Sequence, residues 1–204
     1  KGKIRENNWK EICEEHEKED SEKSRLLKRL ASGDLPEGFF QAFNNHIVDL
    51  QENTDSVATR KCSQIVLEFL KEQLPELVGG SADLSGSNNT ITKLSTAINS
   101  DPSGNYIYYG VREFGMNAIM NGMSLHGGII PFGGTFLVFM DYGRNAVRMS
   151  ALMGIRTIYV FSHDSVALGE DGPTHQPIEQ LTTLRSTPNM HTWRPATLVE
   201  TAVS

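Results

Sequence analysis

The chain has 204 residues, of which 38% are hydrophobic and 22% are charged, and its formal net charge is −6. This length and composition predict a soluble globular protein with one domain and an appendage, because such a chain can bury a sizeable core. No apolar run approaches the roughly 20 residues that a membrane span needs. No cluster of Lys and Arg forms the basic stripe typical of nucleic-acid binding. We therefore expect neither a membrane nor a nucleic acid as a partner.

The two cysteines, Cys13 and Cys62, lie far apart in the sequence and do not have the spacing of metal ligands. Isolated cysteines favour a reducing compartment. The first residues also lack the apolar core of a secretory signal. We therefore expect a cytoplasmic protein.

Residues 1–54 are predicted to form a largely helical linker. The stretch from Trp9 to Leu30 has a helical pattern with many charges and few apolar positions, which favours a helix lying over a surface. Its acidic run fits either a solvated helix face or a contact with a partner. Turn-forming residues between Ser32 and Pro36 end this pattern. An apolar cluster that can anchor the linker then follows at Phe39, Phe40, Phe43 and Ile47.

Residues 55–204 are predicted to form a compact α/β domain. A helix from Val57 to Leu74 opens it, with Thr54 or Asp55 as the N-cap. We then expect strands at 77–80, 106–109, 135–140, 155–161 and 190–193, and helices at 113–126, 142–153, 176–184 and 195–204. This alternation predicts a mostly parallel sheet with helices on both faces. Because the sequence ends inside a predicted helix, we expect the domain to continue beyond residue 204.

The loops that follow the predicted strands concentrate polar side chains. In an open parallel sheet, ligands bind at the carboxyl ends of the strands. The loop from Ser162 to Gln176 carries two histidines and three carboxylates, so it fits a functional loop better than a solvated turn. Together these loops supply Asp83, Ser87, Arg112, Glu113, Asp141, Tyr142, His163, Asp164, Glu170, Asp171 and His175.

Glu113 opens the predicted helix 113–126 and is a candidate acid/base group. The helix dipole would stabilise its carboxylate, whereas burial beside Phe114 and Met116 would favour the neutral acid. A carboxyl group poised between these limits can protonate a nitrogen heterocycle and take the proton back. The alternative is a glutamate that only stabilises the helix N-terminus.

Phe136, Phe139 and Tyr142 recur every third residue around the end of a predicted strand. If the strand ends near Val138, the two phenylalanines can face the same loop and form a platform for a flat ring. Ordinary core packing explains the same spacing.

His163 and His175 lie beside turn residues, which favours proton transfer or anion contact over a buried structural role. Their separation gives no support for a zinc site. The rigid turn Asp171-Gly172-Pro173 is expected to fix the position of Asp171 relative to His175.

Several motifs resemble those of the transketolase family and occur in the order and with the spacing typical of that family. The resemblance begins near Thr59 and covers the pyrimidine-binding domain, and the first 55 or so residues resemble the linker that precedes it. The motifs are Ala58-Thr-Arg-Lys-Cys-Ser-Gln, Gly79-Gly-Ser-Ala-Asp-Leu, Tyr109-Gly-Val-Arg-Glu-Phe-Gly-Met, Ser124-Leu-His-Gly-Gly, Asp141-Tyr-Gly-Arg-Asn-Ala-Val-Arg, His163-Asp-Ser and Gly169-Glu-Asp-Gly-Pro-Thr-His-Gln-Pro.

The resemblance implies a thiamine diphosphate enzyme that is a homodimer with the cofactor between its subunits. It implies that Glu113, as a catalytic residue, hydrogen-bonds a ring nitrogen of the cofactor's aminopyrimidine. Phe139 would stack on this ring, Phe136 and Tyr142 would form other walls of the pocket, and Asp83 would lie near the cofactor.

The resemblance also implies transfer of a two-carbon ketol unit from a ketose phosphate to an aldose phosphate in the pentose phosphate pathway. The expected substrates are xylulose 5-phosphate, ribose 5-phosphate and erythrose 4-phosphate. Arg60, Ser87 and His163 would bind the sugar phosphate, with a bidentate contact from Arg60. Asp171 and His175 would bind the sugar hydroxyls, and His175 would also act in catalysis.

The Gly-Asp-Gly motif that holds the diphosphate and its Mg²⁺ or Ca²⁺ in this family does not occur in the sequence. We therefore expect those ligands in a preceding domain, no metal ligands among these residues, and no turnover by this chain alone. A dihydroxyacetone synthase-type ketol transferase and a non-catalytic module are the alternatives. Deoxyxylulose-phosphate synthase fits less well, because it usually has Glu-Gln-His where this chain has Glu113-Phe-Gly.

Overall fold

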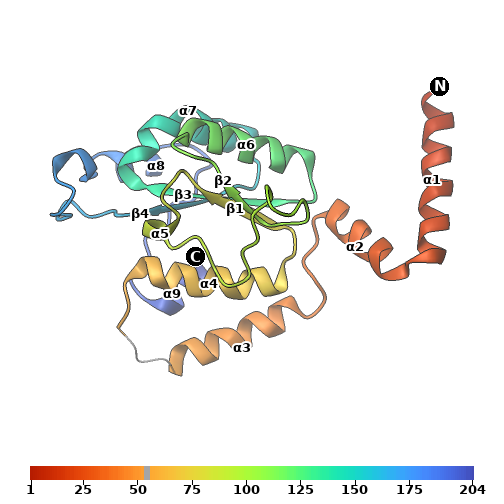
Figure 1. Ribbon diagram of the computed structural model, residues 1–204, viewed down its shortest axis with the longest axis horizontal. Helices are drawn as coiled ribbons and strands as arrows, with labels where there is room; N and C mark the ends of the chain where they lie inside the picture. The colour runs from red at the N-terminus through yellow and green to blue at the C-terminus, as the bar shows by residue number, and fades with distance from the viewer. Residues whose placement is uncertain (53–55) are drawn as a thin grey trace.

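The computed structural model describes residues 1–52 and 56–204, and its centre is a four-stranded sheet (Figure 1). The strand order is β2-β1-β3-β4, and all three neighbouring pairs are parallel. The strands are β1 (Leu77–Ser81), β2 (Tyr106–Tyr108), β3 (Ile130–Phe136) and β4 (Ile158–Ser162). The predicted α/β class with a mostly parallel sheet is confirmed.

Helices cover both faces of the sheet, as predicted (Figure 1). On one face, α6 (Glu113–His126) packs against α7 (Met140–Met153). On the other face lie α3 (Phe39–Glu52), α4 (Thr59–Gln73) and the short α9 (Leu198–Val203). The remaining helical segments are α5 (Ser85–Asn88), η1 (Leu137–Phe139), η2 (Pro173–His175) and α8 (Gln180–Arg185).

Two glycines in the middle of β3 bring neighbouring elements close to the sheet. A Cβ atom at Gly133 would lie only 2.4 Å from the sulfur of Met120 on α6. On the opposite face, a Cβ at Gly134 would lie 2.7 Å from Cγ2 of Thr90. The strand therefore needs glycine at both positions, because its backbone is approached closely from both sides.

The structure corrects several predicted boundaries. The strand expected at 135–140 instead runs from Ile130 to Phe136, after which η1 turns the chain into α7. Residues 190–193 form no strand. The helix expected at 176–184 is shorter, because η2 precedes it and α8 begins only at Gln180. Helix α4 begins at Thr59 with Ala58 at its N-cap and no capping side chain. The proposed caps Thr54 and Asp55 lie outside the described residues.

The N-terminal segment forms two helices where one was expected. Helix α1 (Gly2–Glu19) has no buried residue, and its apolar side chains Trp9 and Ile12 are 58% and 56% exposed, so the prediction that it lies over a surface is wrong for the described chain. Asp20 leaves helical geometry with φ −143°, and its side chain accepts a hydrogen bond from the backbone N–H of Lys23, which starts α2 (Ser21–Ser32). Gly33 then ends α2 in a left-handed conformation with φ 77°.

Only some of the apolar residues that follow the linker turn pack against the domain. On α3, Phe39 belongs to the core beneath the sheet with Leu77 and Phe132, and Phe43 packs against it. Phe40 meets the Phe39 ring edge-on, with centroids 5.7 Å apart, but is 69% exposed. The prediction that all four apolar residues anchor the linker is therefore wrong for Phe40.

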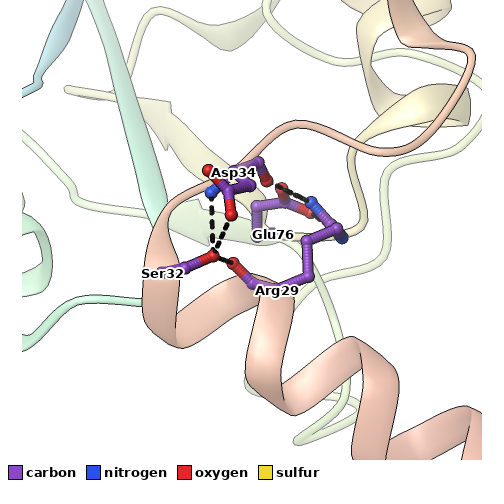
Figure 2. Close-up of polar contacts among 4 residues, drawn as sticks. All are labelled: Arg29, Ser32, Asp34 and Glu76. Carbon is purple, nitrogen blue, oxygen red and sulfur yellow. Dashed lines mark hydrogen bonds and ion pairs between the residues drawn. The ribbon is translucent and has the colours of Figure 1, made fainter.

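An ion pair joins α2 to the residue just before β1 (Figure 2). The Arg29 guanidinium donates to both carboxylate oxygens of Glu76, at 2.6 and 2.9 Å, and to the backbone carbonyl of Asp34 at 3.1 Å. The Ser32 hydroxyl lies 2.6 Å from the Asp34 carboxylate and holds the turn after the helix. The Glu76 and Arg29 side chains are only 5% and 17% exposed, so this pair fixes the linker to the domain.

Candidate functional site

A cleft of about 720 Å³ lies where β1 and β2 end and α6 begins. This is the carboxyl edge of the sheet, where α/β proteins bind ligands. Four of the residues predicted to bind a cofactor line it: Asp83, Glu113, Phe139 and Tyr142. Its other lining residues are Ala82, Leu84, Val111, Arg112, Phe114 and Gly115.

Glu113 is the first residue of α6 and is 7% exposed. Its carboxyl group accepts no hydrogen bond from any residue within 1–52 or 56–204. Gly143 on α7 permits the close approach of this helix end, since a Cβ there would lie 3.2 Å from the Glu113 carbonyl oxygen. Glu113 thus lines the cleft, and the hydrogen-bonding capacity of its carboxyl group is free of partners among the described residues.

The rings of Phe136, Phe139 and Tyr142, which were predicted to form an aromatic platform, lie together where β3 ends and α7 begins. Phe136 ends β3 and Phe139 ends the η1 turn, and their rings stack with centroids 5.6 Å apart and planes 6° from parallel. Tyr142, in the first turn of α7, lies with its ring centroid 5.9 Å from that of Phe139. Phe136 is buried and supports Phe139 from behind, so it does not line the cleft itself.

The two predicted histidines bracket this aromatic pair. The His163 ring stacks on Phe136 with centroids 3.7 Å apart, and the His175 ring meets Phe139 edge-on at 5.1 Å. The turn at Gly172, with φ 75°, leads into η2 and so positions His175. The loop from Ser162 to Gln176 thus reaches the site from the β4 side.

Arg60 on α4 and His163 also meet, although 103 residues separate them. One guanidinium nitrogen of Arg60 lies 3.3 Å from Nε2 of His163 and donates to the backbone carbonyl of Ser87 at 3.4 Å. Burial and the charge of Arg60 lower the pKa of His163, and the carboxylate of Asp171 partly offsets them. The three residues predicted to bind a phosphate therefore form one cluster.

Two acidic residues of the polar loops, Asp141 and Asp164, form contacts with other side chains outside the cleft. The Asp141 carboxylate accepts a hydrogen bond of 2.8 Å from the buried side chain of Gln180. The Asp164 carboxylate pairs with Arg194 at 2.6 Å. Both contacts are structural, so neither acid contributes a free carboxylate to the cleft.

Sequence reasoning missed Ser81, Asn88 and Ser162 as site residues. Their side chains form a hydrogen-bonded row behind His163. The sequence signal was weak, because Asn88 lies in a polar loop among many similar residues.

Two negative findings apply to the described part of the chain, residues 1–52 and 56–204. Its His, Cys, Asp and Glu side chains contain no group of three or more that could hold a metal ion. Its helices include none that is long and apolar enough to cross a membrane.

A parallel sheet with an acidic and aromatic cleft at its carboxyl edge defines an α/β ligand-binding domain. Residues 55–203 match the family described as transketolase, pyrimidine binding domain. The chain therefore belongs to this family, which confirms the resemblance seen in its motifs.

Similar proteins support this assignment over the whole chain. Transketolase 2 of Vibrio vulnificus is 53% identical over 204 residues, which are 100% of this chain and 31% of that protein. The solved transketolase of Leishmania mexicana is 40% identical with a TM-score of 0.90, over 98% of this chain and 29% of that one. A transketolase of Pichia stipitis in complex with sedoheptulose 7-phosphate is 42% identical with a TM-score of 0.89, over 98% of this chain and 30% of that one. The chain thus spans about a third of the relatives that it matches.

Proposed function

We propose that this chain is the pyrimidine-binding part of a transketolase that transfers a two-carbon ketol unit from a ketose phosphate to an aldose phosphate. The observation that carries the proposal is the buried carboxyl group of Glu113, which lies beside Phe139 and Tyr142 in the cleft without a partner among the described residues. The proposed enzyme acts in the cytoplasm, in the pentose phosphate pathway. Within it, residues 1–54 are the linker and residues 55–204 the domain.

The residues of the cleft fit the aminopyrimidine of thiamine diphosphate. An aromatic face stacks well on a flat heterocycle, and Phe139 offers one that Phe136 supports from behind. A carboxyl group at the edge of that ring can hold a ring nitrogen and exchange a proton with it. Glu113 has this role in the proposal, and Asp83 and Tyr142 complete the pocket. The bound cofactor would supply the electron sink that lets a carbon–carbon bond beside a carbonyl break and form.

The diphosphate and its Mg²⁺ or Ca²⁺ are assigned to residues outside this chain. Supporting this, the sequence has no Gly-Asp-Gly motif and the described residues offer no metal cluster. The proposal therefore includes a homodimer in which the cofactor lies between subunits, and no turnover by this chain alone.

The polar cluster beside the aromatic pair is proposed to bind the sugar phosphate. Arg60, Ser87 and His163 would hold the phosphate, because a guanidinium and an imidazole can both donate to its oxygens. Asp171 would bind the sugar hydroxyls, and His175 would both bind them and donate or accept a proton near the reacting carbons. Xylulose 5-phosphate, ribose 5-phosphate and erythrose 4-phosphate are the proposed substrates.

The test is an assay of the whole protein that contains this chain, with thiamine diphosphate and Mg²⁺ present. With xylulose 5-phosphate as donor and ribose 5-phosphate as acceptor, we expect turnover that depends on the cofactor. Faster turnover with formaldehyde as acceptor would instead identify a dihydroxyacetone synthase-type enzyme. The absence of turnover with either acceptor, in a protein that binds the cofactor, would favour a non-catalytic module.

A further inference from the structure

A row of hydrogen-bonded side chains leads from the core to the back of the proposed phosphate cluster. The amide nitrogen Nδ2 of Asn88, a residue with 0% exposure, donates to the hydroxyl of Ser162 at 2.6 Å. The same hydroxyl lies 2.8 Å from Nδ1 of His163. The other ring nitrogen of His163, Nε2, faces Arg60. Each group in the row thus touches the next.

The inner end of this row is rigid. Asn88 is the last residue of α5, and its Oδ1 accepts a hydrogen bond of 2.9 Å from the hydroxyl of Ser81, which ends β1. The Ser81 hydroxyl also lies 3.0 Å from the carbonyl oxygen of Gly134 on β3. With the single Ser81 proton on Oδ1, the amide NH₂ of Asn88 points the other way, toward Ser162. Ser81 at the end of β1 and Ser162 at the end of β4 therefore hold the amide between them.

Arg60 and the Asn88 amide are donors at the two ends of the row, and they restrict the protonation of His163 and the hydrogen bonds of Ser162 between them. Arg60 is always protonated, so Nε2 of His163 must be an acceptor while the guanidinium faces it. The proton then resides on Nδ1 and is donated to the Ser162 oxygen, which also accepts from Asn88. If Nε2 instead turns its own N–H toward an anion, the Ser162 hydroxyl can donate to Nδ1. Ser162 can therefore serve both neutral forms of the ring, whereas an alanine could serve neither.

The backbone of His163 is in an uncommon conformation, which the surrounding contacts must hold in place. Its φ of 55° places it in the left-handed region, where residues with a Cβ are uncommon. The stacking on Phe136 fixes the plane of the ring but not the choice of protonated nitrogen. The Ser162 hydroxyl, which Asn88 holds in place, contacts Nδ1 in either neutral form and so keeps Nε2 on the side of Arg60.

We propose that Asn88 and Ser162 are positioning residues that orient the His163 imidazole so that Nε2 faces Arg60 and can present a proton to a phosphate group. This proposal rests on the proposed function, because it takes His163 as a ligand of the sugar phosphate. Removing the hydroxyl leaves the buried Asn88 amide without its acceptor and Nδ1 of His163 without its hydrogen-bond partner. The loss of the hydroxyl should therefore weaken binding of the phosphate group and leave the rate of ketol transfer unchanged.

The test compares two ketose donors in the whole protein, xylulose 5-phosphate and the unphosphorylated erythrulose. For Ser162→Ala we expect KM for xylulose 5-phosphate to rise about tenfold, with kcat within about twofold of wild type. KM for erythrulose should not change. Ser162→Thr keeps the hydroxyl and should restore the wild-type KM. Ser165→Ala, which removes an exposed hydroxyl in the same loop, is the matched control.

A second measurement shows whether the effect passes through His163. In a His163→Ala background, adding Ser162→Ala should change KM for xylulose 5-phosphate by less than about twofold, because the group being positioned is gone. Asn88→Ala should act in the same direction as Ser162→Ala. If Asn88→Ala fails to fold, the half-buried Ser162 still provides the test.

Several results would overturn the proposal. These are an unchanged KM in Ser162→Ala, an equal rise for both donors, or an undiminished effect in the His163→Ala background. Binding of inorganic phosphate, measured by calorimetry, distinguishes a failure of the positioning role from a failure of the proposed function. If the wild-type protein shows no ketol transfer but Ser162→Ala weakens phosphate binding about tenfold, the positioning role stands and the proposed function falls.

Discussion

The rings of Phe136 and Phe139 stack with their planes 6° apart, although in a continuous strand these residues would face opposite sides of the sheet. The stacking is possible because β3 ends at Phe136 and the η1 turn brings the next aromatic ring to the same side. His163 and His175 close around this pair from the loop after β4. One local change of conformation therefore places the proposed cofactor platform beside the proposed substrate cluster.

The first prediction concerns this platform. Phe139→Ala removes the ring that faces the cleft, so the dissociation constant for thiamine diphosphate in the whole protein should rise about tenfold. Calorimetric titration measures it. Phe40→Ala, which removes an exposed ring on α3, is the control and should leave the constant unchanged. A loss of affinity that is equal in both variants would contradict the assigned role.

The second prediction concerns the ion pair that fixes the linker. Glu76→Gln leaves the largely buried guanidinium of Arg29 without its carboxylate, so the free energy of unfolding of this chain should fall by about 2 kcal/mol at neutral pH. Urea unfolding measures this difference. Glu6→Gln breaks a well-exposed pair with Lys10 and should cost less than about 0.5 kcal/mol.

The ion pair between Arg29 and Glu76 also makes the free energy of unfolding depend on pH. Burial alone raises the pKa of Glu76, but the hydrogen bond and charge of Arg29 outweigh it and leave the pKa below its usual value. The native state thus binds fewer protons than the unfolded state at acidic pH. The stabilisation is present above the unfolded pKa of about 4.3 and is lost as pH falls through the lower, folded value. The difference in the free energy of unfolding between wild type and Glu76→Gln should therefore become smaller below about pH 4. A difference that stays constant with pH would contradict this role of the ion pair.

The third prediction concerns the buried Lys71. Its ammonium donates to the hydroxyl of Ser95 at 2.8 Å and lies over the rings of Tyr106 and Phe132, with no carboxylate partner among the described residues. Burial lowers its pKa to about 8. Between about pH 8 and the unfolded value of about 10.4, the unfolded state binds the extra proton, so the chain should become more stable as pH rises.

Urea unfolding at several alkaline pH values tests this behaviour. Lys71→Met keeps the apolar stem and removes the titrating group, so its gain in stability over this pH range should be smaller than that of wild type. Lys93→Met is the control, because the Lys93 side chain is 89% exposed. If Lys71→Met and wild type gain stability equally, the buried ammonium does not titrate in this range.

The sequence predicts those elements whose ends carry strong local signals. Helix α6 has the predicted bounds, since Gly110 precedes it and Gly127 and Gly128 follow it. Strand β3 begins five residues before the predicted strand, because Gly133 and Gly134 resemble a turn when read locally. Only the tertiary packing of Met120 and Thr90 against them shows why a strand needs glycine there.

In the site, too, some features could be predicted from the sequence and others depend on tertiary packing. The sequence and its family resemblance point to Glu113, Phe139 and His163, and the structure brings these residues to one edge of the sheet. Their roles stay predictions until they are tested in the whole protein. The contact between Asn88 and Ser162, 74 residues apart, could not be predicted. It depends on β1, β3 and β4 lying side by side, and local periodicity does not determine strand order.

In the proposed enzyme, the Glu113 carboxyl group holds a ring nitrogen of the cofactor and exchanges a proton with it. The most direct measurement is ketol transfer by a Glu113→Gln variant of the whole protein, saturated with thiamine diphosphate and checked to be a dimer. Glu179→Gln, an exposed change outside the cleft, is the control. We predict that Glu113→Gln loses roughly a thousandfold in kcat while the control keeps wild-type turnover. Turnover of Glu113→Gln within about threefold of wild type would contradict the claim.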